Sequence, residues 1–275
     1  MKWLSGILTV GTFTVLYVFE KRQPLRKQIE QKELSTARNL AIAATAGIAV
    51  NLFEKPVTDK LTRFVEKQNV GLLKIVRLPK FLETALAVIL LDYTLYIWHV
   101  LTHKSPFLWR FHQIHHADLD LTASTAIRFH FGEMTISVLW RAGQILLIGV
   151  SPEALKTWQT LLFLSVLFHH SNVRLPKAFE NKLQHFIITP RLHGIHHSIV
   201  KAEMDSNWSS GLSIWDFLHG TFRNDISQSE ITIGVAEFDE VEKVTISKML
   251  AEPFSDFRQK HRIANNGESD RIVSF

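Results

Sequence analysis

The sequence predicts an all-α integral membrane protein with about four to five transmembrane or re-entrant helices and a cytosolic helical cap. Hydrophobic residues make up 46% of the 275 residues, and a mean hydropathy of +0.06 lies between soluble and wholly embedded chains. Long apolar runs alternate with charged segments. Of the 14 histidines, six lie between His99 and His130 and six between His169 and His197, beside these runs.

The composition excludes several classes of site. The chain has no cysteine, so it has no disulfide, no thiolate metal site and no self-contained iron–sulfur cluster. Its net charge of +5 suits a protein beside an anionic membrane. The Lys and Arg residues are dispersed and the aromatic residues lie in apolar runs, which argues against a nucleic-acid partner. Because the chain has no cysteine, any metal must be held by nitrogen and oxygen ligands.

Residues 1–80 are expected to form membrane anchor helices and an interfacial helix. Residues 3–18 are apolar and uncharged, and approach the roughly 17–25 residues of a span. The flank 20–24 has no small-x-small cleavage site, so we expect a retained anchor rather than a signal peptide. Residues 40–53 are short for a full span, which leaves spanning, tilted and re-entrant helices open. Residues 56–73 have the spacing of an interfacial helix, and equally that of a soluble surface helix.

Three further apolar runs follow. The best span is 81–101, which is interrupted by Glu83 and Asp92. Residues 134–150 and 154–168 are joined by a short connection in which a serine can cap the helix that the next proline begins, and this predicts a helical hairpin. Both histidine-rich segments then emerge on the same side of the membrane and can meet. Polarity rises afterwards, and 226–275 is expected to be a charged C-terminal tail.

The histidines are spaced as metal ligands. Residues 98–116 contain an H-x3-H and an H-x2-H-H, and a second H-x2-H-H recurs at 193–197. On helices these spacings put imidazoles on one face. One such pair is common and often reflects packing alone, but three motifs exceed what one metal needs. We therefore expect two metals, each held by about four nitrogens with positions left open. No His-Glu-x-x-His is present, which argues against a zinc protease.

These motifs resemble the fatty acid hydroxylase/sterol desaturase superfamily of integral-membrane di-iron enzymes. Three further segments extend the likeness: T-A-S-T-A-I-R-F-H-F-G-E ending at Glu133, H-H-S-N at 169–172, and W-D-F-L-H-G-T at 215–221. The likeness covers roughly residues 80–225, and 81–225 is expected to be a fatty acid hydroxylase-like catalytic domain. Val100, the Phe131–Gly132 pair and the segment 207–211 depart from the family pattern, which leaves the subfamily open.

The resemblance implies a site of two iron ions. The motif positions that match the family's ligands are His99, His103, His112, His115, His116, His193, His196 and His197, and His170 is the additional one we expect. Whether His169 or His170 turns inward stays open, as does ligation by His130.

The function that the resemblance implies is the O2-dependent hydroxylation or desaturation of an unactivated C–H bond of a lipid, fatty acyl or sterol-like. Within the superfamily the alternative is an alkylglycerol ether monooxygenase. A zinc-dependent membrane hydrolase is a second class. A non-catalytic metal carrier is a third, disfavoured because transport needs weak, exchangeable ligation. The sequence names neither the lipid nor the position of attack.

Asp92 is expected to orient a ligand histidine. It precedes His99 by seven residues and His103 by eleven, so the three share a face of a continuous helix. A carboxylate inside a span is costly unless it is paired, and ligating imidazoles commonly donate their second N–H to a carboxylate. The alternatives are capping of a neighbouring helix and a pairing with Arg141.

The chain is also expected to need an external electron donor, a cytochrome or a ferredoxin with its reductase. It has no G-x-G-x-x-G fingerprint and no segment large enough for a flavin or haem domain. A basic aqueous face is the expected docking surface, formed by Lys104, Arg110, Arg174, Lys177 and Lys182. The charges flanking the spans do not settle their orientation. We expect a multi-pass protein with its active site facing the cytoplasm, where reductant is available.

Overall fold

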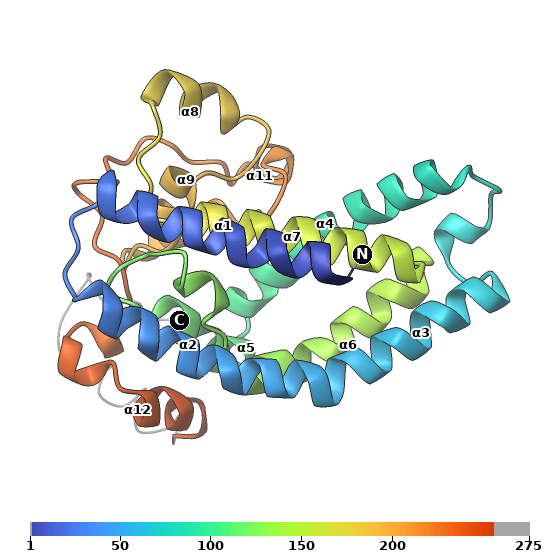
Figure 1. The fold of residues 1–275 in the computed structure, drawn as a ribbon, viewed down its shortest axis with the longest axis horizontal. Coiled ribbons are helices and arrows are strands. Elements are labelled where there is room, and N and C mark those ends of the chain that lie inside the picture. The colour runs from blue at the N-terminus through green and yellow to red at the C-terminus, as the bar shows by residue number, and fades with distance from the viewer. Residues whose placement is uncertain (1, 256–275) are drawn as a thin grey trace.

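Residues 2–255, the part of the chain that the computed structural model describes, form helices joined by loops (Figure 1). Within that part, isolated bridges are the only β-structure. The long helices are α1 (Lys2–Arg22), α2 (Lys32–Ala49), α3 (Lys55–Gln68), α4 (Lys80–Lys104), α6 (Phe131–Ile148) and α7 (Pro152–His170). The shorter ones are α5 (Pro106–His116), α8 (Lys177–Leu183), α9 (Pro190–His196), α10 (Lys201–Met204), α11 (Ile214–His219) and α12 (Ile246–Ala251). Single turns are η1 (Val50–Glu54), η2 (Leu72–Lys74), η3 (Thr125–Ile127), η4 (Ala236–Phe238), η5 (Val241–Lys243) and η6 (Glu252–Phe254). The predicted all-α class is confirmed.

α2 and α3 form one continuous helical stretch, although the sequence suggests two separate segments. They are joined by η1, a turn of π-helix. Pro56 lies two residues after this turn and has no N–H to donate to the carbonyl of Leu52, so a regular α-helix would lose that bond here. The wider turn before the proline keeps the helix unbroken. The amphipathic segment after the proline packs its buried side chains Thr58, Thr62 and Val65 inward, and α3 contacts α6.

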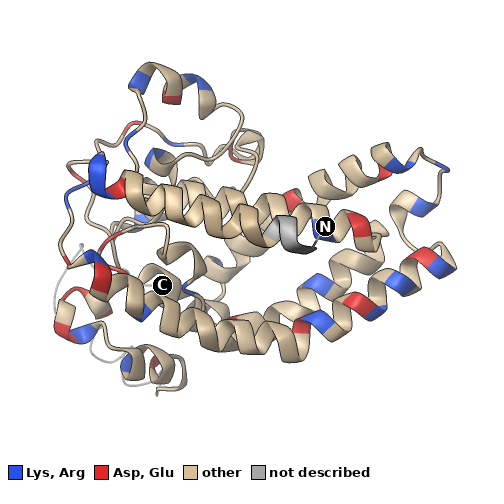
Figure 2. Ribbon diagram, in the orientation of Figure 1, with Lys and Arg blue, Asp and Glu red and all other residues tan. Residues whose placement is uncertain are grey.

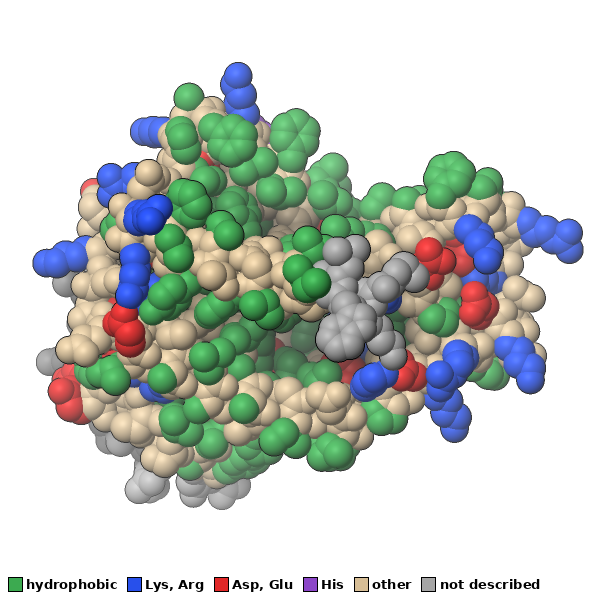
Figure 3. Space-filling model, in the orientation of Figure 1, with side chains coloured by type: hydrophobic (Ala, Val, Ile, Leu, Met, Phe, Trp, Pro, Cys, Tyr) green, Lys and Arg blue, Asp and Glu red, His purple; other side chains and the backbone are tan. Residues whose placement is uncertain are grey.

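Two stretches of the described residues are long and apolar enough to cross a membrane, judged by length and composition: Lys32–Lys74 and Lys80–Lys104. Charged residues gather at the two ends of the long helices and are sparse along the middle of α1 and α2 (Figure 2). Hydrophobic side chains cover much of the surface between these ends (Figure 3). An apolar band between two charged ends suits a protein surrounded by lipid. The expected count of four to five spans stays a prediction.

α6 and α7 are joined as predicted, but they do not pack as a hairpin. Ser151 Oγ accepts a hydrogen bond from Ala154 N at the start of α7, and Gly149 ends α6 with a left-handed φ of 86°. Beyond the connection the helices diverge (Figure 1). α6 lies against α2, α3 and α4, whereas α7 lies against α1 and α4. The expectation of a packed helical hairpin is wrong. A short connection makes the chain reverse its direction, but it does not determine which helices pack against each other along their length.

The short helices and loops form a cap at one end of the long helices (Figure 1). The ends of α1 and α2 at the cap are tied into it by buried polar groups. Glu20 Oε1 accepts hydrogen bonds from Ala123 N and Asn172 N. Asn39 of α2 donates its Nδ2 to Asp118 Oδ2 at 2.7 Å, and Asp118 pairs with the fully buried Arg128 at 2.9 Å. The N-terminal helices and the histidine-bearing segments therefore belong to one packed body.

Candidate metal centre

The histidine motifs lie where helices end at the cap. α4 carries the H-x3-H in its last two turns, α5 ends with the first H-x2-H-H, and α7 ends with the His-His pair. The second H-x2-H-H lies at the end of α9, where His197 caps the helix. Ser105 separates α4 from α5, and Pro106 begins α5, because proline begins a helix more readily than it continues one. The nine histidines predicted as ligands are all buried, and none is more than 8% exposed.

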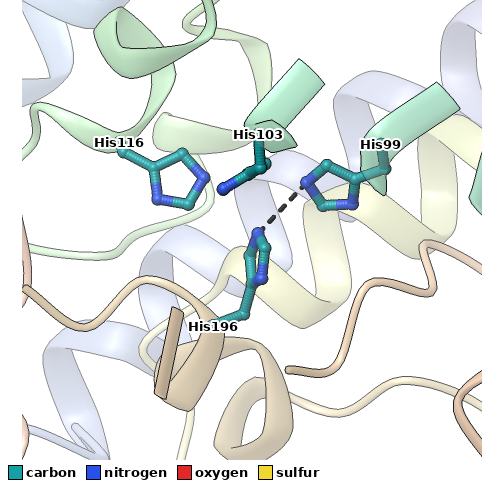
Figure 4. Close-up of side chains that lie close together, drawn as sticks. All are labelled: His99, His103, His116 and His196. Atoms are coloured by element: carbon teal, nitrogen blue, oxygen red, sulfur yellow. Dashed lines mark hydrogen bonds between the residues drawn. The ribbon is translucent and has the colours of Figure 1, made fainter. Parts of the chain in front are cut away.

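Four of these histidines form a first group, which comprises His99, His103, His116 and His196 (Figure 4). Each offers one ring nitrogen, and these nitrogens all lie within 4.8 Å of one another. The rings come from α4, α5 and α9 and point toward a common centre (Figure 4). No described residue bonds Nε2 of His103 or either ring nitrogen of His116, although these atoms are buried.

Four others form a second group, which comprises His115, His170, His193 and His197, again with one ring nitrogen each within 4.8 Å of the rest. Nε2 of His170 lies 2.9 Å from Nε2 of His115 and 3.0 Å from Nε2 of His193. The two groups touch, since the ring of His116 stacks on that of His197 with centroids 4.1 Å apart. The structure thus brings the two histidine-rich segments together as two adjoining groups of four.

His112 belongs to neither group but borders both. Its ring centroid lies 4.8 Å from that of His103 and 5.3 Å from that of His115. Nδ1 lies 2.9 Å from Oε1 of Glu133, and an ionised carboxylate only accepts, so Nδ1 donates. The buried Nε2 has no hydrogen-bond partner among the described residues. Nε2 is therefore the atom left to bind a ligand.

The two adjacent histidines at the end of α7 make different contacts. His170 joins the second group, and its Nδ1 donates to the carbonyl oxygen of Val166 at 2.8 Å. His169 is also fully buried, with its ring centroid 4.1 Å from that of His193. Neither of its ring nitrogens has a partner within residues 2–255. His170 is thus the member of the pair that offers a ring nitrogen to the second group, and His169 borders that group.

The remaining histidines of the described chain have other contacts. His130 caps α6, because its Nδ1 accepts from Gly132 N at 2.9 Å while its Nε2 lies 3.2 Å from the carbonyl oxygen of Leu250. Both of its nitrogens are thus engaged away from the two groups. His185 stacks on phenylalanine rings at the surface, and His219 lies against tyrosines of α4.

The first group presents lone pairs that face each other. His99 Nδ1 lies 2.7 Å from the carbonyl oxygen of Trp208, and His196 Nδ1 lies 2.9 Å from that of Ser206. A carbonyl only accepts, so each Nδ1 carries the proton and each neutral ring presents an unprotonated Nε2. These two Nε2 atoms are 3.1 Å apart, the approach drawn as a dashed line in Figure 4. Two lone pairs at this distance repel unless a cation lies beside both.

The electrostatics and spacing fit a metal ion. Burial lowers the pKa of His196 to about 3, and it lowers the pKa of His197 well below its ordinary value, with neighbouring histidines adding to both shifts. The rings are therefore neutral near pH 7, which is the form that ligates metal. Two nitrogens held at about 2.1 Å by one ion lie roughly 3.0–3.4 Å apart. The observed 3.1 Å falls in this range.

The hydrogen bonds that orient the ligand rings were not found by the sequence analysis. The carbonyls of Ser206 and Trp208 belong to a loop, and a main-chain oxygen leaves no signal in the sequence. That loop is held by Asp216, which accepts from Trp208 N at 2.8 Å and from Ser209 N at 3.1 Å. Glu133, named only as the end of a motif, is the carboxylate that orients His112.

Contrary to the prediction, Asp92 does not contact the histidines. Its Oδ2 accepts hydrogen bonds from Leu212 N at 3.0 Å and from the indole N–H of Trp215 at 2.7 Å. A Cβ at Gly211 would lie 2.3 Å from Asp92 Oδ1, so the loop approaches closely only because this residue is glycine. The carboxylate within α4 therefore anchors the loop after residue 210, and the pairing with Arg141 does not form either.

A cavity of about 530 Å³ begins at the two groups and extends between α2, α4, α6 and α7. Histidines of both groups line one end of it, including His99, His115 and His193. Apolar side chains such as Met134 and Phe163 form much of its wall. Its size lies in the range of sites that bind one small ligand. The candidate metal centre thus faces an apolar chamber inside the helices.

A model of the fatty acid hydroxylase family matches residues 84–221, half of the chain and the part that contains all nine predicted ligands. The protein belongs to the fatty acid hydroxylase family. It is 29% identical to ornithine lipid hydroxylase OlsE of Rhizobium tropici over 268 residues, which are 92% of this chain and 76% of that protein. No solved structure matches the fatty acid hydroxylase chain.

Other relatives of this family member align over about half of the chain. Human (Homo sapiens) alkylglycerol monooxygenase is 29% identical over 133 residues, which are 48% of this chain and 28% of that protein. Human cholesterol 25-hydroxylase is 25% identical over 138 residues, or 49% of each chain. The chain thus spans less than half the length of these two relatives. Hydroxylases and monooxygenases are oxidoreductases, and this fatty acid hydroxylase family member is an enzyme of that class.

Proposed function

We propose that this protein is an O2-dependent di-iron oxygenase of the membrane that hydroxylates or desaturates an unactivated C–H bond of a lipid. The observation that carries the proposal is the pair of facing Nε2 lone pairs, at 3.1 Å, in a group of four buried histidines. A second group of four lies beside it, and both border an apolar cavity. Neutral nitrogen ligands in this number suit two transition-metal ions.

The two groups would each hold one ion, with His112 between them. When bound there, two iron ions supply the activation of O2 and the oxidation of the C–H bond. The orienting hydrogen bonds hold the ligand rings in one tautomer, so that the Nε2 atoms of His99, His170 and His196 stay directed at the ions.

Aromatic side chains cover the ligand rings and would exclude water from them. Phe129 stacks on His115 with ring planes 6° apart and centroids 4.4 Å apart. Trp208 covers His103, with its ring centroid 4.6 Å from the imidazole. These contacts leave the ligand rings buried, while the apolar wall between the long helices accepts an alkyl chain. A dry chamber also protects reactive species from side reactions with water.

Lipid hydroxylation is favoured by the similarity to an ornithine lipid hydroxylase over 92% of the chain. The similarity to alkylglycerol monooxygenase supports a second candidate, hydroxylation of a carbon next to an ether oxygen followed by cleavage. Both candidates share the same oxidising centre, and they differ in the lipid that fills the cavity.

The electron donor would be a separate protein. The chain has no cysteine for an iron–sulfur cluster. Arg174, Lys177 and Lys182 are exposed on the cap and would attract an acidic cytochrome or ferredoxin. Lys104 contributes less positive field, since it pairs with Asp205 at 2.6 Å. The proposed orientation places this cap in the cytoplasm.

Lipid profiling and metal analysis test the proposal together. Membranes of cells that express the chain should contain an oxygenated or desaturated lipid, and its formation should require O2 and reductant. The His115→Ala protein should insert in membranes but give no product, whereas His185→Ala, at an exposed histidine outside both groups, should match the native chain. Purified protein that holds zinc alone and hydrolyses a lipid without O2 would contradict the proposal.

A further inference from the structure

The cavity has a cationic side chain in its wall, away from the histidines. Arg141 lies on α6, eight residues beyond Glu133, which bonds His112. At the helical rise this separation is about 12 Å. The Arg141 side chain is only 13% exposed and lines the cavity. A guanidinium buried among apolar helices is costly unless its N–H groups find acceptors.

Acceptors are present for only some of the N–H groups of Arg141. Nη1 of Arg141 donates to Gln144 Oε1, and the guanidinium lies 4.3 Å above the ring of Trp158. The carboxylate of Glu54, from the π-helical turn η1, is 3.8 Å from Nε, which is too long for a hydrogen bond. The buried Nε therefore has no hydrogen-bond partner in the described part of the chain.

Two indole N–H groups in the same wall share this condition. Trp140 precedes Arg141 on α6, and Trp158 stacks against its guanidinium from α7. Both tryptophans line the cavity, and Nε1 of each is buried without a partner among residues 2–255. An indole N–H only donates, so the three groups together lack acceptors rather than donors. We call Arg141, Trp140 and Trp158 the donor cluster.

We propose that the donor cluster binds an acceptor oxygen of the lipid, a carboxylate or an ester or amide carbonyl, and thereby sets which carbon reaches the histidines. The binding half of this proposal rests on the unpartnered donors, whose nitrogens are buried within the cavity wall and reach a ligand when the side chains turn toward it. The positional half rests on the proposed function. Glu54 balances the charge of the arginine, so the oxygen held there need not be ionised.

The cavity would then fix the distance between the bound oxygen and the histidines. A lipid whose acceptor oxygen sits at the donor cluster extends its alkyl chain past apolar side chains such as Leu162 and Met134 toward the histidines. Since the two ends are about 12 Å apart along α6, the carbon presented for oxidation lies at a set distance from that oxygen. Arg141 would thus be a specificity-determining residue for the position of attack.

Equilibrium binding of three radiolabelled sixteen-carbon probes, at one detergent concentration, tests the binding half on the purified, metal-free full chain. The probes are palmitate, methyl palmitate and hexadecane, which differ in the acceptor oxygen. The native chain should bind at least one oxygen-bearing probe about tenfold more tightly than hexadecane, as a charged hydrogen bond predicts. Arg141→Met should abolish this preference and keep the affinity for hexadecane. Arg63→Met, an exposed arginine on α3, is the matched control and should keep the preference.

The probes also distinguish the source of the oxygen. A preference for palmitate alone would assign a carboxylate, and a preference for both oxygen-bearing probes would assign a carbonyl. Equal binding of hexadecane by the native chain, or a preference that survives Arg141→Met, would overturn the proposal. Trp158→Phe keeps the ring under the guanidinium and removes one donor. It should reduce the preference about threefold, and it keeps the test decisive if Arg141→Met does not fold.

This test is independent of the proposed chemistry, because binding to the metal-free chain needs neither iron nor turnover. The positional half is read from product structure in active membranes. Arg141→Met should spread the site of oxidation over several neighbouring carbons while His185→Ala should leave it unchanged. A single unshifted product from Arg141→Met would contradict the positional half, whereas the absence of any oxygenated product from the native chain would contradict the proposed function instead.

Discussion

The two histidine groups are oriented by different kinds of structure. In the first group, His99 and His196 donate to carbonyls of Trp208 and Ser206, which lie on a loop. In the second group, His170 donates to Val166 one turn back in its own helix. A helix supplies its carbonyl wherever it forms, but a loop must be held by side chains. The first group should therefore respond to changes far from its ligands, and the second should not.

The largest effect is expected from removing one ligand of either group. His196→Ala in the first group and His193→Ala in the second should each reduce product formation by at least about a thousandfold, since in the proposed function both ions would act together in one oxidation. Lipid analysis of membranes with equal amounts of inserted protein measures this. Residual activity near the native level in either variant would show that one group suffices.

A smaller effect, confined to the first group, is expected from Asp216→Ala. This change removes the acceptor that holds Trp208 N and Ser209 N, so the loop no longer presents its carbonyls to His99 and His196. Loss of such outer partners typically costs about 10–100-fold in metal affinity. Chelator competition should show one weakened site and one native site. Equal weakening of both sites would contradict the difference between the groups.

Glu133→Ala should act between the groups, because His112 borders both. Without the carboxylate, Nδ1 of His112 loses its acceptor and the ring is free to turn. We expect roughly 10-fold weaker metal binding. Glu133→Gln keeps an acceptor oxygen and should recover most of the affinity. A Gln variant as weak as the Ala variant would indicate that the charge matters rather than the orientation.

The smallest effect on metal is expected from Asp92→Asn. The carboxylate accepts from Leu212 N and Trp215 Nε1, and the amide can replace only part of this. The substitution should lower the free energy of unfolding by about 1–2 kcal/mol, measured by thermal unfolding, and leave the metal content unchanged. A 10-fold or greater loss of metal affinity with native stability would restore the role that the sequence suggested.

The convergence of the motif histidines could be predicted because it depends on simple rules. Spacings of three and four residues stack imidazoles on one helix face, and an even number of crossings returns the chain to the same side. The structure shows that His115 meets His170 and that His99 meets His196, from segments far apart in the sequence.

The remaining features required coordinates, for identifiable reasons. The acceptors of His99 and His196 are main-chain oxygens, which every residue carries, so no pattern marks them. Asp92 shares a helical face with His99 by spacing, but its carboxylate accepts from Leu212 N of the neighbouring loop instead of from a histidine. The divergence of α6 and α7 also has no local signal, because α4 packs against both.

Metal counting on paired variants tests the central claim most directly. The chain should be purified without metal, loaded anaerobically with Fe²⁺ and analysed for iron per chain alongside His196→Ala, His193→Ala and His185→Ala. Two groups of four histidines predict about two ions for the native chain and for His185→Ala, and about one ion for each of the other variants. One ion or none in the native chain, or two in both ligand variants, would contradict the account.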